Sequence, residues 1–204
     1  SLHDALPIFV KAIGFTGSRK GGMAIYTAAA NRAEPIPVYA EMSAVNPVII
    51  LPGAAAANAN AIANGLAASV TLGVGQFCTN PGLIIAIAGE GLDRFERKLV
   101  QLISDASPGK MLHPGISKAY AEKRETALLQ GDVEMVAVSS KDALEFEGRP
   151  TLAQASGEAF LNNPVLHKEV FGPYSIIIRC SDMHQLQEVA EELEGQLTAT
   201  LMAL

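Results

Sequence analysis

Tryptophan is absent from this sequence of 204 residues, and cysteine and histidine are scarce, with two and four residues respectively. The two cysteines, Cys78 and Cys180, lie far apart, which argues against a disulfide framework and favours a reducing compartment. Neither belongs to a Cys-x-x-Cys motif, and the histidines are scattered, so no spacing typical of metal ligands is present. We therefore expect neither disulfides nor a metal site.

Positive charge is also limited, since 15 lysines and arginines stand against 21 aspartates and glutamates, for a net charge of -6. Such a chain lacks the basic surface that binds nucleic acid or anionic lipid. The longest nearly unbroken apolar run, VIILPGAAAA, is too short to span a bilayer and contains Pro52 and Gly53. The first residues, SLHDALPIF, lack the basic start and long apolar centre of a secretory signal. We predict a cytoplasmic protein that binds neither nucleic acid nor membranes.

Short apolar runs and amphipathic segments alternate along the chain. The runs typical of strands cover residues 10–15, 34–40, 46–53, 82–89, 133–140 and 173–179. Helical patterns cover residues 21–33, 54–73, 92–103 and 116–131. A last helix opens at Asp182, with Gln185 at the spacing of a capping box. Strands that alternate with helices predict an α/β fold with a largely parallel sheet, and the alanine-rich second helix predicts close packing.

Two polar features follow the first two predicted strands. The glycine turn of GSRKGG, Gly17 to Gly22, follows the first strand and opens a helix, and Glu41 ends the second strand. A helical crossover makes these strands parallel, so both features lie at the edge where α/β proteins bind ligands. The turn could hold an anion such as a pyrophosphate at the helix N-terminus, and a partly desolvated Glu41 could act as a general base. A plain turn and a solvated glutamate are the commoner meanings of such features.

Cys78 lies in TLGVGQFCTNPG, between a Gly-Val-Gly segment and an Asn-Pro-Gly turn. Both flanks require special backbone geometry, and two interpretations stay open: a nucleophile favoured by nearby backbone N–H groups, or a buried and inert thiol. Cys180 ends an apolar run and is interpreted as a core residue. His113 and His167 are candidates for a Cys/His pair, although neither stands in a hydrolase context, which favours surface or capping roles.

The motifs FTGSRKGG, AEMSAVNP, GQFCTNPG and EVFGP, in this order, resemble those of the aldehyde dehydrogenase superfamily from Val10 to Leu201. Within it, PIPVYAEMSAVNP and GQFCTNPG are most similar to the branch of 2-oxoglutarate semialdehyde (2,5-dioxopentanoate) dehydrogenases. The resemblance implies that residues 10–41 are the end of a Rossmann-like NAD(P)-binding domain. Residues 42–204 would be a parallel-sheet α/β catalytic domain, truncated at its end. Residues 1–9 match nothing in the family, and we interpret them as foreign sequence.

The resemblance also implies an activity and its residues. Cys78 would attack the aldehyde carbon, and Glu41 would be the general base that activates water for hydrolysis of the thioester. The product would be a carboxylic acid, with 2-oxoglutarate semialdehyde as the expected substrate. The parent enzyme would be a homo-oligomer that acts on a small aldehyde.

NAD or NADP is the implied cofactor. Gly17, Ser18 and Gly22 match the glycine motif that contacts it, and Glu169 and Phe171 match the residues that hold the nicotinamide ribose and ring. The sequence departs from the common pattern of the family where Met42-Ser43-Ala44 replaces Leu-Gly-Gly and where Arg19 replaces a frequent threonine.

Members of the family are more than twice as long as this chain, so the resemblance describes a fragment that lacks the first part of the cofactor domain and the C-terminal end. One alternative is an inert truncated fragment with exposed sheet edges. Another is a cysteine-dependent acyl hydrolase that uses His113 or His167. The contexts of Glu41 and EVFGP disfavour the hydrolase.

Overall fold

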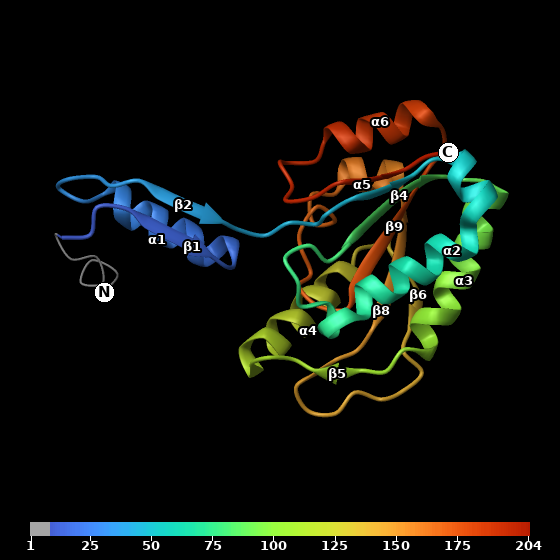
Figure 1. Ribbon diagram of the computed structural model, residues 1–204, viewed down its shortest axis with the longest axis horizontal. Coiled ribbons are helices and arrows are strands. Elements are labelled where there is room, and N and C mark those ends of the chain that lie inside the picture. Colours follow the sequence, from blue (N-terminus) through green and yellow to red (C-terminus); the bar gives the residue numbers. More distant parts are fainter. Residues whose placement is uncertain (1–8) are drawn as a thin grey trace. The chain divides into compact units, whose positions relative to one another are not determined.

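The computed structural model describes residues 9–204, which divide into two compact units (Figure 1). The first unit ends at Ser43, close to the predicted domain boundary after Glu41, and the second runs from Ala44 to Leu204. The interpretation of residues 1–9 as foreign sequence concerns residues that, apart from Phe9, lie outside the described range. In the part of the chain that the structure describes, no helix is long and apolar enough to cross a membrane.

The first unit is a strand–helix–strand element. Strand β1 (Ile13–Thr16) is followed by helix α1 (Arg19–Ala30) and strand β2 (Val38–Glu41). The two strands are parallel, as predicted from the helical crossover, and their register pairs Thr16 with Glu41. Ser18 caps α1, because its side-chain oxygen accepts a hydrogen bond of 3.2 Å from the amide of Gly21.

The second unit is built on a six-stranded sheet with the order β10-β3-β4-β9-β8-β6. The strands are β3 (Val48–Ile50), β4 (Leu83–Ile87), β6 (Glu134–Val138), β8 (Thr151–Ser156), β9 (Tyr174–Cys180) and β10 (Thr200–Met202). All neighbouring strands are parallel except β6 and β8. The predicted α/β fold with a largely parallel sheet is confirmed. Strands β8 and β10 were not predicted from the sequence. A separate antiparallel pair joins β5 (Gly109–Lys110) and β7 (Glu147–Gly148).

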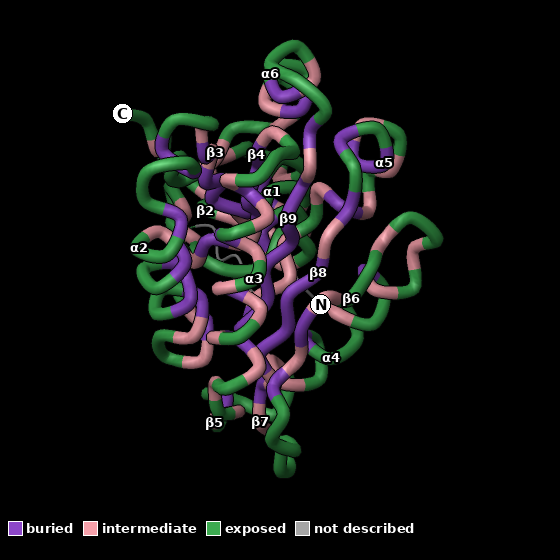
Figure 2. Tube along the Cα trace, turned by 90° about the vertical axis from the view of Figure 1, so that its right-hand side faces the viewer, coloured by how far each residue is buried: buried purple, intermediate pink, exposed green. Residues whose placement is uncertain are grey.

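Helices cover both faces of this sheet. They are α2 (Pro52–Thr71), α3 (Glu90–Asp105), α4 (Pro114–Leu128), α5 (Gly157–Asn162) and α6 (Met183–Glu191), with a short 3-10 helix, η1 (Leu72–Gly75), after α2. Side chains alternate across the sheet: Ile177 of β9 joins a core with α2 and α3, whereas Ile176 and Ile178 join a core with α4, α5 and α6. Strands β4, β8 and β9 are accordingly buried along most of their length (Figure 2).

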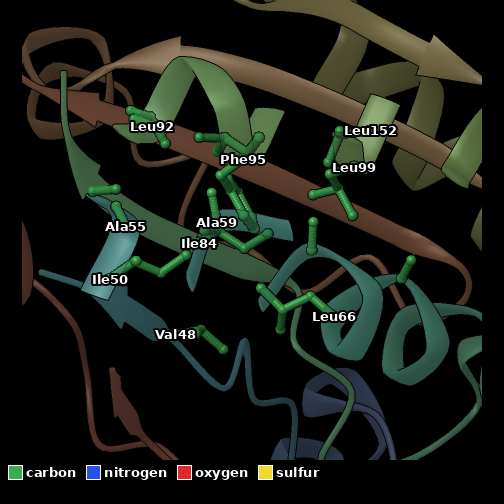
Figure 3. Packing of buried hydrophobic residues seen from close by; sticks show 14 of the residues in the cluster. Val48, Ile50, Ala55, Ala59, Leu66, Ile84, Leu92, Phe95, Leu99 and Leu152 are labelled. Atoms are coloured by element: carbon green, nitrogen blue, oxygen red, sulfur yellow. The ribbon is translucent and has the colours of Figure 1, made fainter. Parts of the chain in front are cut away.

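The alanines of α2 allow the close packing that the sequence predicts. A Cβ atom on Gly91, in the first turn of α3, would lie only 3.0 Å from the carbonyl carbon of Ala55. Phe95 and Leu99 of α3 are fully buried between the two helices and the sheet (Figure 3). Burying a large apolar side chain of this kind contributes about 1.5–3 kcal/mol, so this core anchors the second unit.

The cap predicted at Asp182 is confirmed, and the Gln185 side chain reaches back to Ser181, one residue before the cap. The side chain of Asp182 accepts a hydrogen bond of 2.9 Å from the amide of Gln185, and the side chain of Gln185 accepts one of 2.8 Å from the amide of Ser181. The bond from the Gln185 amide is the main cause of a lowered pKa of Asp182, because it stabilises the ionised carboxylate. Helix α6 therefore starts where the sequence predicts.

Candidate active site

Cys78 is exposed on the loop between η1 and β4. Helix α2 ends two residues before the predicted Gly73, and Gly73, Val74 and Gly75 then follow one another in the left-handed region, with φ of 53°, 59° and 63°. A β-branched residue in this region is a genuine outlier. The special geometry expected before the cysteine is therefore present, and the interpretation of Cys78 as a buried thiol is wrong.

Hydrogen bonds hold this loop against the second unit. The side-chain nitrogen of Asn46 donates to the carbonyl oxygens of Cys78, at 2.8 Å, and of Asn80, at 3.0 Å. The side-chain nitrogen of Asn80 donates at 3.2 Å to the carbonyl oxygen of Gly172. On the other side, the side-chain oxygen of Gln76 accepts a bond of 2.8 Å from the amide of Leu112. The thiol thus sits on a loop with fixed ends.

The segment EVFGP lies beside the cysteine loop. Glu169 and Phe171 line a cavity of about 20 Å³, together with Phe77 and Asn80 of the loop, and Tyr174 of β9 also reaches it. That volume has room for a single water molecule. One carboxylate oxygen of Glu169 accepts a bond of 3.4 Å from the amide of Ala44. The structure therefore brings three of the predicted site residues, Cys78, Glu169 and Phe171, into one region of the second unit.

The remaining predicted site residues lie together in the first unit. Gly17 donates its amide to the carbonyl oxygen of Glu41 at 3.1 Å, Ser18 caps α1 and Gly22 is buried in its first turns. A Cβ atom on Gly22 would lie 2.6 Å from Cγ of Met42. Met42, where the sequence departs from the common pattern of the family, thus occupies the space that a side chain at position 22 would need. That Glu41 acts on a thioester held by Cys78, as the resemblance implies, stays a prediction.

Cys180 is a core residue, as interpreted from the sequence. Its side chain is fully buried among the residues packed around α6, and desolvation raises the pKa of its thiol to about 11, with a further contribution from the charge of Asp182. A thiol in this state is a poor nucleophile, because the reactive form is the thiolate. Of the two cysteines, only Cys78 is open to a substrate.

The two candidate histidines have structural roles. His113 caps α4, since its Nδ1 accepts a hydrogen bond of 2.9 Å from the amide of Gly115. His167 stacks on Phe160 with ring centroids 4.1 Å apart, and its Nε2 lies 2.8 Å from the carbonyl oxygen of Phe160. Across residues 9–204, the structure gives neither histidine a hydrogen bond to Cys78. In the described residues, neither of these histidines forms with Cys78 the pair that a cysteine hydrolase would need.

Sequence reasoning missed Asn46 and Asn80, the residues that hold the loop. A signal for Asn46 existed, since asparagine is one of the few residues other than glycine that tolerates a left-handed backbone, and Asn46 has a φ of 47°. Its partners could not be read from the sequence, because they lie 32 and 34 positions away.

The chain is similar to known proteins along almost its whole length. Residues 9–203 match the model of the aldehyde dehydrogenase family. The chain is 48% identical over 192 residues to alpha-ketoglutaric semialdehyde dehydrogenase 2 of Azospirillum brasilense, and 43% identical over 195 residues to alpha-ketoglutaric semialdehyde dehydrogenase of Acinetobacter baylyi. These alignments cover 94% and 95% of this chain but 37% of each relative, so the chain spans well under half of their length.

The fold is shared with solved structures. PnpE from Pseudomonas sp. WBC-3 superposes with a TM-score of 0.80 at 22% identity. A structure of PnpE in complex with nicotinamide adenine dinucleotide superposes with a TM-score of 0.79 at 22% identity. The superposition covers 98% of this chain and 42% of that one. Because the family model matches residues 9–203, almost the whole of this chain, the chain belongs to the aldehyde dehydrogenase family.

Proposed function

We propose that this chain carries the cysteine part of an NAD(P)-dependent dehydrogenase that oxidises 2-oxoglutarate semialdehyde to 2-oxoglutarate. The observation that carries the proposal is the exposed Cys78, on a loop held in place beside Glu169 and Phe171. The choice of substrate is supported by the two relatives named above, which are 48% and 43% identical to this chain.

In the proposed reaction, the thiolate of Cys78 forms a C–S bond to the aldehyde carbon and gives a thiohemiacetal. A backbone N–H of the Cys78 turn stabilises the oxyanion that develops on the former carbonyl oxygen. A nicotinamide, when bound, would supply the hydride acceptor, and loss of hydride from this carbon would leave a thioester on Cys78. Glu41 then takes a proton from water, the water oxygen attacks the thioester, and the C–S bond breaks to release the carboxylate.

The residues present fit a dinucleotide. The Ala44 amide engages one carboxylate oxygen of half-buried Glu169, which leaves the second oxygen for a ribose hydroxyl. Half-buried Phe171 offers an apolar ring to the nicotinamide. In the first unit, Gly17, Ser18 and Gly22 surround the N-terminus of α1, where the helix dipole favours an anion. These five residues would hold NAD or NADP.

We also propose a setting for the enzyme from its composition and its family. The net charge of -6 favours a protein that binds neither nucleic acid nor anionic membranes. The scarcity of cysteine favours the cytoplasm. The resemblance to the family favours a homo-oligomer.

The test uses the complete reading frame that contains this sequence, expressed beside the 204-residue chain. With 2-oxoglutarate semialdehyde and NAD or NADP, the complete enzyme should form NAD(P)H, the Cys78→Ala variant should form none, and the matched Cys180→Ala variant should keep its activity. The 204-residue chain alone should show no turnover. Activity in Cys78→Ala, or oxidation of other aldehydes in strong preference to this one, would contradict the proposal.

A further inference from the structure

The side chain of Asn46 connects three segments that are distant in the sequence. Its nitrogen donates to the carbonyl oxygens of Cys78 and Asn80, at 2.8 and 3.0 Å. Its oxygen accepts from the hydroxyl of Thr198, at 3.0 Å, and from the amide of Thr198, at 3.3 Å. The side-chain nitrogen makes two bonds as a donor, and the side-chain oxygen makes two as an acceptor. Because the nitrogen only donates and the oxygen only accepts, these bonds fix which way the amide group is turned. Asn46 is 3% exposed, so these bonds are shielded from water.

The backbone around Asn46 is fixed as well. The amides of Val45 and Asn46 both donate to the side-chain oxygen of Gln196, at 2.7 and 3.3 Å. The carbonyl oxygen of Val45 accepts a bond of 3.0 Å from Gly82, at the exit of the cysteine loop. These bonds hold the backbone around Asn46 independently of the bonds that its side chain makes to the loop. The backbone of Asn46 itself has a left-handed φ of 47°.

We propose that Asn46 is a positioning residue for the nucleophile, a role that rests on the proposed function of Cys78. A peptide group is planar, so holding the carbonyl oxygen of Cys78 fixes the whole plane between Cys78 and Thr79. The second bond, to Asn80, fixes the plane that leads into Pro81. With both planes held, the loop keeps one backbone conformation around Cys78, and the thiol is presented in one direction.

The side chain at position 46 has to donate hydrogen bonds if it is to hold the loop that carries Cys78. Two carbonyl oxygens converge on the Asn46 nitrogen, and only a donor satisfies both. Asn46→Asp replaces the amide with a carboxylate of nearly the same shape. This carboxylate would repel the two carbonyl oxygens and would place a negative charge beside the loop that carries Cys78. The bonds to Thr198 could still form, so the substitution acts selectively on the side that holds Cys78.

The test measures the rate at which iodoacetamide alkylates each cysteine of the 204-residue chain as a function of pH, by peptide mass spectrometry. Buried Cys180 serves as an internal monitor, because it should react only when the unit unfolds. In Asn46→Asp, alkylation of Cys78 at neutral pH should slow about tenfold, the size expected for losing two hydrogen bonds, and its pH profile should move to higher pH. Cys180 should stay protected.

The matched control is Thr198→Val, which removes the hydroxyl at the other end of the Asn46 side chain. Its Cys78 rate should remain within about twofold of the parent, because the bonds to the Cys78 loop persist. A slowing equal to that of Asn46→Asp would overturn the proposal, and so would a parent-like rate and pH profile in Asn46→Asp with Cys180 protected.

If Cys180 becomes reactive in Asn46→Asp, this variant has unfolded, and Asn46→Gly is tested in its place. Glycine tolerates the left-handed backbone at position 46 and removes the side-chain amide. An altered Cys78 rate with Cys180 protected supports the proposal, whereas an unchanged rate, or unfolding again, overturns it. Alkylation needs neither aldehyde nor cofactor. A dehydrogenase that stays active in Cys78→Ala would therefore refute the proposed function without deciding whether Asn46 orients the loop.

Discussion

The backbone of Gly172 leaves no room for a side chain on Gly75. A Cβ atom on Gly75 would overlap the carbonyl group of Gly172 and lie 2.6 Å from the backbone nitrogen of Pro173. Gly172 is itself restricted, because its own Cβ would lie 2.7 Å from Cε2 of Tyr120 and closer still to Cδ2 of the same ring, and because its φ is 153°. The cysteine loop and the EVFGP segment thus meet through bare backbone, which places Cys78 and Phe171 in the same region.

Gly75→Ala should therefore destabilise the second unit. Alanine would have to adopt a φ of 63° and displace a neighbouring backbone, and the two effects together should lower the free energy of unfolding by about 2 kcal/mol or more. Urea denaturation monitored by circular dichroism measures this change. The matched control is Gly65→Ala in α2, where a Cβ meets nothing within 4 Å. That variant should gain about 0.5–1 kcal/mol, since alanine favours the helix. Equal effects at both positions would refute the role of the backbone contact.

Phe95→Ala should remove the largest side chain from the core between α2, α3 and the sheet. Phe95 is fully buried, so the loss should be about 3–5 kcal/mol of unfolding free energy, from lost burial and the cavity left behind. Leu112→Ala is a suitable control, because Leu112 is 86% exposed and should change the stability by less than about 0.5 kcal/mol. Both values come from denaturant titration, and a Phe95→Ala variant as stable as the control would show that this core is not as described.

The buried thiol of Cys180 should make stability depend on pH in the alkaline range. Its pKa is raised from 9.0 to about 11 by desolvation, so between these values the folded chain holds a proton that the unfolded chain releases. The free energy of unfolding should therefore fall as pH rises from about 9 to 11, by on the order of 1–3 kcal/mol. Cys180→Ala removes the titrating group and should show a shallower fall over the same range. Parallel curves for the two proteins would mean that other groups control this dependence.

Glu41→Gln should slow thioester hydrolysis in the complete enzyme, because glutamine keeps the shape of the side chain but cannot accept a proton from water. Rapid mixing should show a burst of NAD(P)H near one equivalent per active site, followed by a steady rate lowered by about 10²–10⁴-fold. Cys78→Ala should show no burst, since no thiohemiacetal can form. Turnover of Glu41→Gln at the parent rate would assign the general base to another residue.

The local pattern of the sequence predicted the elements whose signal is contained in a few neighbouring residues. The apolar run of β4, the amphipathic face of α3 and the cap at Asp182 were all found in this way. Strand β8 was missed because polar Thr151 and Gln154 interrupt its apolar pattern. Thr151 is nevertheless fully buried, since its hydroxyl donates to the carbonyl oxygen of Arg149 at 3.0 Å.

The sequence by itself determined the α/β class, the parallel first pair of strands and the position of Cys78 in a turn with special backbone geometry. Only the tertiary structure decided that this thiol is exposed, that EVFGP lies beside it and that Asn46 holds its loop. The physical reason is the range of the interactions. Asn46 bonds to Cys78 across 32 positions and to Thr198 across 152, and such pairings form only when the packed sheet brings distant segments within hydrogen-bonding distance.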